Sequence, residues 1–259
     1  MKKNLILHHH PGLGDHFLCN GMVHHYAQKY ETLYLPCRKK FYNTIDCLYQ
    51  DFPNIIPKAF DNDWDNLEKE VSDWSSETKF DYLKIGYDKV IYTYLEREQC
   101  PPKWVGINFE RQFYEQAEVL YSERYSNFKL PKQIKGADDL YEKVVGNVKN
   151  YILVHDSSSA SDEYEFDMFG WRNGKNSDLT IIKIKDNITD NLLDWIKVIE
   201  NATEIHVSPS SVFCLVDSLP LDLKADLYFH DLRADNGLLL VNSHLNDNRW
   251  VIVEYDQKI

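Results

Sequence analysis

Asp15 is a candidate catalytic base, because it follows a glycine-rich turn directly after the first apolar run of the sequence. Residues 7–16 read LHHHPGLGDH. Gly12 and Gly14 allow a tight turn between a strand and a helix, and we expect them to bind the donor substrate, which can approach the backbone closely there. Such a turn lies at the carboxyl end of a parallel strand, where ligands dock in open α/β sheets. A carboxylate at this place can take a proton from an acceptor hydroxyl.

Asp15 also fits a purely structural role as a cap that satisfies the first amide groups of the helix. The two roles are compatible. His10 and His16 flank the turn, and we expect them to contact the acceptor and to adjust the basicity of the carboxylate. The segment lacks both the Gly-Lys-Ser/Thr ending of a phosphate-binding P-loop and the third glycine of the dinucleotide fingerprint, so it indicates neither ATP nor NAD.

A second candidate segment is rich in hydroxyl groups and precedes an apolar helical pattern. Ser208, Ser210 and Ser211 follow the short apolar run at 204–207. Hydroxyls and free amides at a helix start can bind an anion such as a diphosphate. The alternative is ordinary helix capping by the same serines, with the helix beginning at Ser210 or Ser211.

A third candidate segment follows another apolar run, at 151–155. His155 and Ser157 stand at its end, and their side chains could hold phosphate or sugar hydroxyls. The serines there are equally compatible with a plain loop. Arg172 is a candidate to neutralise a leaving diphosphate, because the arginine fork matches phosphate geometry, although a surface charge explains it as well.

Residues 12–21, GLGDHFLCNG, resemble the N-terminal motif of GT-B glycosyltransferases related to the lipopolysaccharide heptosyltransferases. The resemblance implies that Asp15 is the catalytic base. Residues 204–219 are similar in layout to the family's donor-diphosphate segment, with Ser-Pro-Ser-Ser where the family has an Asp-Thr-Gly-like turn. The resemblance therefore implies two Rossmann-like domains that face a cleft, with His155 and its serines opposite Asp15, and a nucleotide-sugar as substrate.

The elements that must position these residues alternate between short apolar runs and longer amphipathic stretches, which predicts an α/β fold with parallel sheets. The predicted strands cover 4–7, 32–35, 54–56, 82–85, 151–155, 179–184, 204–207, 226–229 and 249–253. The predicted helices cover 42–49, 64–74, 110–121, 138–145 and 190–200, with others after Gly14 and from Ser210 or Ser211. Pro and Gly punctuation at 127–136 indicates a linker. It separates an acceptor-side domain at 1–130 from a nucleotide-sugar-binding domain at 138–259.

Composition narrows the classes of partner. The 259 residues include 41 acidic and 29 Lys/Arg residues, a formal charge of −12, which disfavours nucleic acid as a ligand. Apolar runs are too short for a membrane span, and the histidines at 8–10 interrupt any signal-peptide core. Five cysteines without a Cys-x-x-Cys pair indicate reduced thiols in a cytoplasmic protein.

The histidines near the N-terminus do not have the spacing of a metal site, and neither His-Glu-x-x-His nor Asp-x-Asp occurs at a suitable place. We therefore expect no metal and no cofactor. The predicted reaction is an inverting, metal-independent transfer of a hexosyl or pentosyl group from a nucleotide-sugar to a hydroxyl of a glycan or lipid-linked saccharide. Two alternatives remain open: a non-catalytic nucleotide- or carbohydrate-binding protein, and a hydrolase whose base is His155 or His10. The sequence leaves the oligomeric state open.

Overall fold

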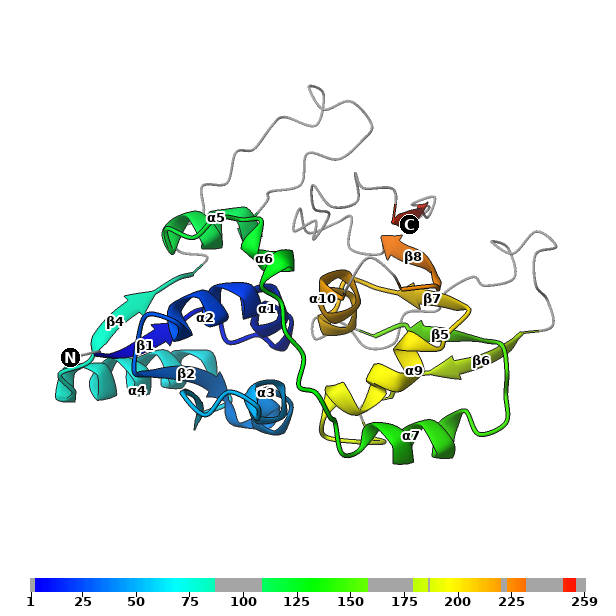
Figure 1. Cartoon of the computed structure of the whole chain (residues 1–259), viewed down its shortest axis with the longest axis horizontal. Coiled ribbons are helices and arrows are strands. Elements are labelled where there is room, and N and C mark those ends of the chain that lie inside the picture. The colour runs from blue at the N-terminus through cyan, green and yellow to red at the C-terminus, as the bar shows by residue number, and fades with distance from the viewer. Residues whose placement is uncertain are drawn as a thin grey trace, which may run out of the picture.

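The computed structural model describes residues 3–86, 109–157, 179–185, 187–219, 223–231 and 249–254. These residues form two lobes, each built on one parallel sheet with helices packed on it (Figure 1). The α/β class expected from the alternation of apolar runs and amphipathic stretches is confirmed.

The N-terminal lobe has a four-stranded sheet in the order β3-β2-β1-β4. Its strands are β1 (Asn4–His8), β2 (Thr32–Arg38), β3 (Ile55–Phe60) and β4 (Asp81–Lys84). Its helices are α1 (Leu13–Leu18), α2 (Asn20–Ala27), α3 (Tyr42–Tyr49), α4 (Trp64–Glu77), α5 (Phe109–Gln116) and α6 (Glu123–Ser126), with a 3-10 turn, η1 (Lys39–Phe41), after β2. Apolar residues that alternate along β1 and β2 pack on these helices, which is why the lobe has a buried core.

The C-terminal lobe has a five-stranded sheet in the order β6-β5-β7-β8-β9. Its strands are β5 (Tyr151–His155), β6 (Thr180–Lys183), β7 (Glu204–Val207), β8 (Asp226–Asp231) and β9 (Trp250–Glu254). Its helical elements are α7 (Ala137–Val144), η3 (Leu192–Trp195), α9 (Ile196–Glu200) and α10 (Ser211–Ser218). One continuous cluster of buried apolar side chains runs through both lobes.

Strand order decides where a ligand can dock in each lobe. In the N-terminal sheet β1 lies between β2 and β4, and in the C-terminal sheet β5 lies between β6 and β7. The chain changes direction across the sheet at these strands. In α/β folds, ligands commonly dock at such a point, here the carboxyl ends of β1 and β4 and those of β5 and β7. Figure 1 shows the arrowheads of both sheets directed toward the middle of the molecule, where α1 and α10 lie side by side.

The helix expected after the glycine turn is interrupted at Cys19, where α1 ends and α2 begins. The cause is the hydroxyl of Tyr114. It donates to the carbonyl of Leu18 at 3.0 Å and accepts from the amide of Met22 at 3.2 Å, so it replaces the hydrogen bond that a continuous helix would make between these two groups. A long-range contact therefore divides a segment that is uniformly helical in its sequence pattern.

The segment between the lobes has little regular structure. After α6 the chain runs without helix or strand to α7, which agrees with the linker expected at 127–136. The lobes also touch away from this connection. Thr44 of α3 accepts from the amide of Leu192 at 2.9 Å, and Asn43 donates to Asp190 at 2.6 Å. The domain limits at 1–130 and 138–259 stay a prediction.

Candidate functional site

Asp15 lies in the first turn of α1, at the carboxyl edge of the N-terminal sheet. Its side chain is 11% exposed, and its Oδ2 atom lies 2.8 Å from Nδ1 of His10. The cap residue of α1 is Gly12, and no side chain caps this helix. The carboxylate is thus directed back toward the end of β1, where a Cβ atom on Gly12 would collide with Oδ2. A larger residue at position 12 would therefore have to displace the carboxylate of Asp15.

His10 lies between this carboxylate and an aromatic ring. The His10 ring stacks on Trp64 with a centroid distance of 4.5 Å and an interplanar angle of 29°. Trp64 begins α4, just after β3, and the guanidinium of Arg38 at the end of β2 lies 5.8 Å from the same ring. Three strands of one sheet edge therefore contribute to a row of side chains that starts at Asp15.

The other histidines of this edge are buried and neutral. Desolvation lowers the pKa of His8 to about 3 and that of His9 to about 4. It also lowers the pKa of His16 well below its ordinary value. Glu68 approaches Nε2 of His8 at 3.4 Å, but burial and the nearby Lys84 still keep this ring uncharged.

His16 is fully buried, and its ring packs edge-on against His9 at a centroid distance of 4.4 Å. The structure therefore places the His16 side chain below the surface of the lobe. This differs from the acceptor contact expected for His16 on sequence. The physical reason is that the His16 ring packs against His9, just after the end of β1, within the buried part of the lobe.

Several of the predicted donor-binding residues, His155, Ser157, Ser208 and Ser210, meet at the carboxyl edge of the C-terminal sheet. His155 ends β5, and its Nδ1 atom lies 3.0 Å from the hydroxyl of Ser210, while its Nε2 atom lies 3.3 Å from that of Ser157. Ser208 donates to the carbonyl of Ser157 at 2.9 Å. Ser210 also accepts from the amide of Phe213 at 3.4 Å and so caps α10. The helix start predicted at Ser210 or Ser211 is confirmed.

These contacts determine which groups a ligand could use. The hydroxyls of Ser208 and Ser210 already bond within the protein. The half-buried Ser211 is the first residue of α10, and helix geometry leaves the first amides of a helix without intrahelical acceptors. An anion at this edge would therefore bind chiefly to the backbone amides at the start of α10, with Ser211 and the His155 ring beside them.

The two edges come together where α1 packs on α10. A Cβ atom built on Gly14 would lie 2.9 Å from Sγ of Cys214 and 3.5 Å from Cα of Ser211. Because glycine has no side chain, the first turns of the two helices can approach each other this closely. Gly14 thus acts in the contact between the lobes, and its neighbour Asp15 lies in the turn of α1 that packs near the Ser211 end of α10.

Some site residues do not follow from sequence reasoning. No local sequence pattern marks Trp64 as a site residue, apart from its position after a strand. Only the strand order places it beside His10. Asp156 and Lys183, which form a 2.5 Å ion pair at the ends of β5 and β6, also escaped prediction. Arg172, expected to contact the leaving group, lies outside the described residues.

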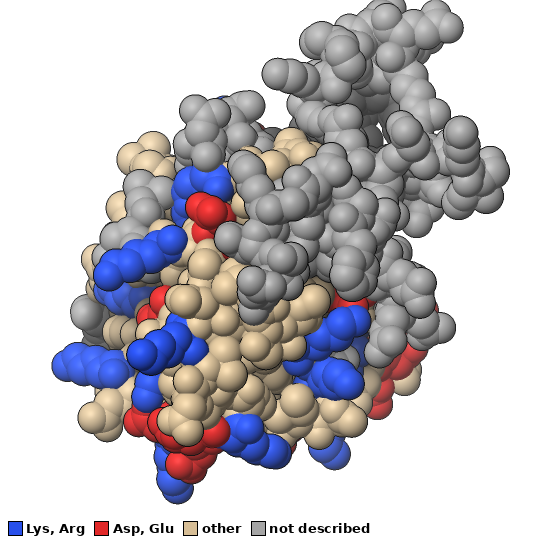
Figure 2. Space-filling view, turned by 90° about the vertical axis from the view of Figure 1, so that its right-hand side faces the viewer, with Lys and Arg blue, Asp and Glu red and all other residues tan. Residues whose placement is uncertain are grey.

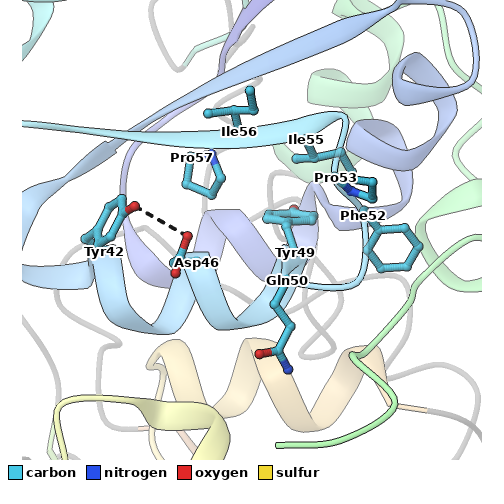
Figure 3. Close-up of a pocket in the computed structure, with 9 residues that line it drawn as sticks. All are labelled: Tyr42, Asp46, Tyr49, Gln50, Phe52, Pro53, Ile55, Ile56 and Pro57. Atoms are coloured by element: carbon cyan, nitrogen blue, oxygen red, sulfur yellow. Dashed lines mark hydrogen bonds between the residues drawn. The ribbon is translucent and has the colours of Figure 1, made fainter.

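A hollow of about 230 Å³ lies elsewhere, between α3 and the start of β3 (Figure 3). It is lined by Tyr42, Asp46, Tyr49, Gln50, Phe52, Pro53, Ile55, Ile56 and Pro57. Tyr42 donates to Asp46 at 3.4 Å across one side of it. None of the predicted site residues lines this hollow, so we do not assign the chemistry to it.

Surface charge, helix length and the arrangement of metal-ligating side chains indicate which other partners the described residues could bind. On the face shown in Figure 2, Lys and Arg side chains form separate groups around an uncharged area, with Asp and Glu among them. No helix in the described residues is both long and apolar enough to cross a membrane. Across the same residues, no group of three or more His, Cys, Asp or Glu side chains is arranged to hold a metal ion.

Neither a protein-family model nor a curated protein matches the chain. Among solved structures, the chain is similar to a family 9 glycosyl transferase from Veillonella parvula, with a TM-score of 0.52, 11% identity, and coverage of 88% of this chain and 80% of that one. It is also similar to TibC, an iron-containing dodecameric glycosyltransferase from enterotoxigenic E. coli, with a TM-score of 0.52, 13% identity, and coverage of 98% of this chain but 63% of that one.

The E. coli heptosyltransferase WaaC, solved with ADP-2-deoxy-2-fluoro heptose, aligns at a TM-score of 0.45 with 7% identity over 97% of this chain and 92% of that one. The first two similarities concern the fold. The chain has the two-domain α/β architecture of GT-B type, so this part of the expectation from sequence is confirmed.

Proposed function

We propose that this protein is a glycosyltransferase that moves a sugar from a nucleotide-sugar donor to a hydroxyl of a glycan or lipid-linked saccharide. The observation that carries the proposal is the contact of the two sheet edges at α1 and α10. It puts a carboxylate of one lobe next to a helix start of the other. Sugar transfer needs both features, because a proton must leave the acceptor while a diphosphate leaves the donor.

The charges of the two lobes indicate which lobe binds the donor and which binds the acceptor. The start of α10 carries the partial positive charge of its amides, which suits the diphosphate of the donor, and His155 lies beside it. The pair of Asp15 with His10 provides the basic centre for the acceptor hydroxyl. Gly12 and Gly14 shape the turn that carries it, and Arg172 stays a candidate partner of the leaving group.

A single displacement would invert the anomeric carbon, since the acceptor oxygen attacks from the face opposite the diphosphate. The reaction is proposed to need no metal, and the amides of α10 would then offset the charge of the leaving group. Holding donor and acceptor on separate lobes lets the protein align them before reaction, which is a large source of rate enhancement. We propose that the protein acts in glycan biosynthesis in the cytoplasm.

The test combines donor binding with turnover. We expect one of the UDP-, GDP-, ADP- or CDP-sugars to raise the melting temperature, because a ligand that binds only the folded state stabilises it. Asp15→Asn should keep this stabilisation but lower the release of nucleoside diphosphate by about 100-fold or more. Asp139→Asn is the matched control, since Asp139 is an exposed carboxylate in the first turn of α7, far from the site.

Each other outcome selects a different function. Donor binding without any turnover would favour a nucleotide- or carbohydrate-binding protein. Hydrolysis without transfer, unaffected by Asp15→Asn but abolished by His155→Ala, would favour a hydrolase. If no nucleotide-sugar changes the melting temperature, the proposal fails. Turnover that EDTA abolishes would contradict the metal-free mechanism.

A further inference from the structure

The hydrogen bond between His10 and Asp15 fixes which nitrogen of the imidazole carries a proton. An ionised carboxylate only accepts hydrogen bonds, so Nδ1 of His10, 2.8 Å from Oδ2, must be the donor. The amide of Gly12 donates toward the same nitrogen at a longer distance, 3.4 Å, which would require Nδ1 to be the acceptor. The shorter contact to a charged oxygen is the stronger of the two. When the ring is neutral, Nε2 therefore holds the lone pair.

His10 is also better placed than Asp15 to meet a substrate. Its side chain is 25% exposed against 11% for Asp15, whose Oδ2 lies against Gly12. Stacking on Trp64 holds the plane of the ring. The ring is thus fixed on one edge by a carboxylate and on one face by an aromatic side chain, which is the arrangement of a general base oriented by a third group.

Among the described residues, the Asp15 carboxylate forms a pair with His10, with Nδ1 and Oδ2 2.8 Å apart. His8, His9 and His16 are buried, and their lowered pKa values keep them neutral. Lys84 is paired with Glu68 at 2.6 Å. Arg38 contacts Trp64 rather than the imidazole itself. A positive charge that forms on His10 during a reaction would therefore be balanced by the carboxylate of Asp15.

We propose that the atom that takes the acceptor's proton is Nε2 of His10, and that Asp15 is the residue that orients and balances it. This inference rests on the proposed function. In the step, the acceptor oxygen forms a bond to the anomeric carbon while the bond from that carbon to the diphosphate oxygen breaks. The electron pair of that bond leaves with the nucleoside diphosphate. The acceptor's proton moves to Nε2, the imidazole becomes an imidazolium, and Asp15 stays ionised throughout.

Removal of the ring offers a direct test, because His10→Ala leaves a space above Trp64 that free imidazole fits. We expect His10→Ala to lower turnover of the donor identified by thermal shift by about 100-fold or more. Added imidazole should restore part of it. Asp15→Asn should not respond to imidazole, since the native ring still occupies the space.

His25 provides the matched control. It forms another pair with a carboxylate, Nδ1 to Glu123 at 2.8 Å, with similar exposure of 21% and 23%, but it lies on α2 away from the sheet edges. His25→Ala should turn over at the wild-type rate and ignore imidazole. Turnover of His10→Ala within about threefold of wild type, or a loss that imidazole does not restore, would overturn the proposal in favour of direct proton transfer to Asp15.

A measurement on the unmodified chain keeps the inference testable without turnover. Nitrogen-15 NMR of labelled histidine reports which ring nitrogen is protonated when the ring is neutral. We expect Nδ1–H in the wild type, and loss of this preference in Asp15→Asn. An Nε2–H tautomer in the wild type would refute the assignment of the base. Failure of the proposed function looks different, because no nucleotide-sugar would then bind or turn over in any variant.

Discussion

Arg124 joins the two lobes through a fully buried ion pair, and its removal should be costly. Its guanidinium is completely buried on α6 and lies 2.8 Å from Asp217 of α10 and 3.2 Å from Glu110 of α5. Asp217 also accepts from the indole of Trp250 at 3.0 Å. Arg124→Met keeps much of the side chain's volume while it removes the charge.

The expected size of the effect follows from what the substitution leaves behind. Two carboxylates, each about 1% exposed, would lose their only shared cation among the described residues. Removing one partner of a buried ion pair typically costs about 3–5 kcal/mol. We expect a loss in this range in the free energy of unfolding. Adding Asp217→Asn should cost less than the sum of the two single changes, because the second substitution removes one of the stranded charges.

Urea unfolding followed by circular dichroism and tryptophan fluorescence measures this loss. Lys197→Ala serves as the control, since the Lys197–Asp138 pair is exposed to solvent and should contribute little. A loss below about 1 kcal/mol for Arg124→Met, or strict additivity with Asp217→Asn, would refute the argument that the ion pair holds the lobes together.

Two further predictions concern pH and the contact between the lobes. Burial lowers the pKa of five histidines, His8, His9, His16, His24 and His230. Because the unfolded chain takes up protons near the ordinary histidine pKa of about 6.5 and these folded rings do not, stability is fully present above that pH. The stability should fall as the pH drops toward about 4, by up to about 1.4 kcal/mol per pH unit for each histidine. Urea unfolding at several pH values would measure this fall. Equal stability at pH 7 and pH 5 would contradict the prediction. Gly14→Ala puts a methyl group 2.9 Å from Sγ of Cys214. Overpacking of this kind should cost about 1–3 kcal/mol of stability, measured by thermal unfolding, and should reduce turnover by separating α1 from α10. A stability and a turnover equal to those of the wild type would disprove the close contact.

Much of the fold could be predicted because its signals are local. Apolar runs gave the strands at 151–155 and 204–207 with the bounds that the structure has. The hydroxyl of Ser210 marked the start of α10, since a side-chain cap acts within three residues along the chain.

The parts that escaped prediction depend on contacts between distant residues. Tyr114 divides α1 from α2 across more than ninety positions of sequence, and no local pattern could reveal it. The Arg124 ion pair and the stacking of Trp64 on His10 likewise arise only once the lobes and strands are assembled. The hydroxyl of Ser208, which the sequence predicts to bind the nucleotide-sugar, forms a hydrogen bond within the protein, because polar groups buried at a sheet edge must find partners.

A crystal structure with the stabilising nucleoside diphosphate bound would test the central claim most directly. We predict that the diphosphate contacts the first amides of α10 near Ser211, with its terminal phosphate directed toward His10 and Asp15. A nucleotide bound elsewhere, for example in the hollow beside Tyr49, or a diphosphate too far from His10 for one sugar ring to bridge the distance, would contradict it.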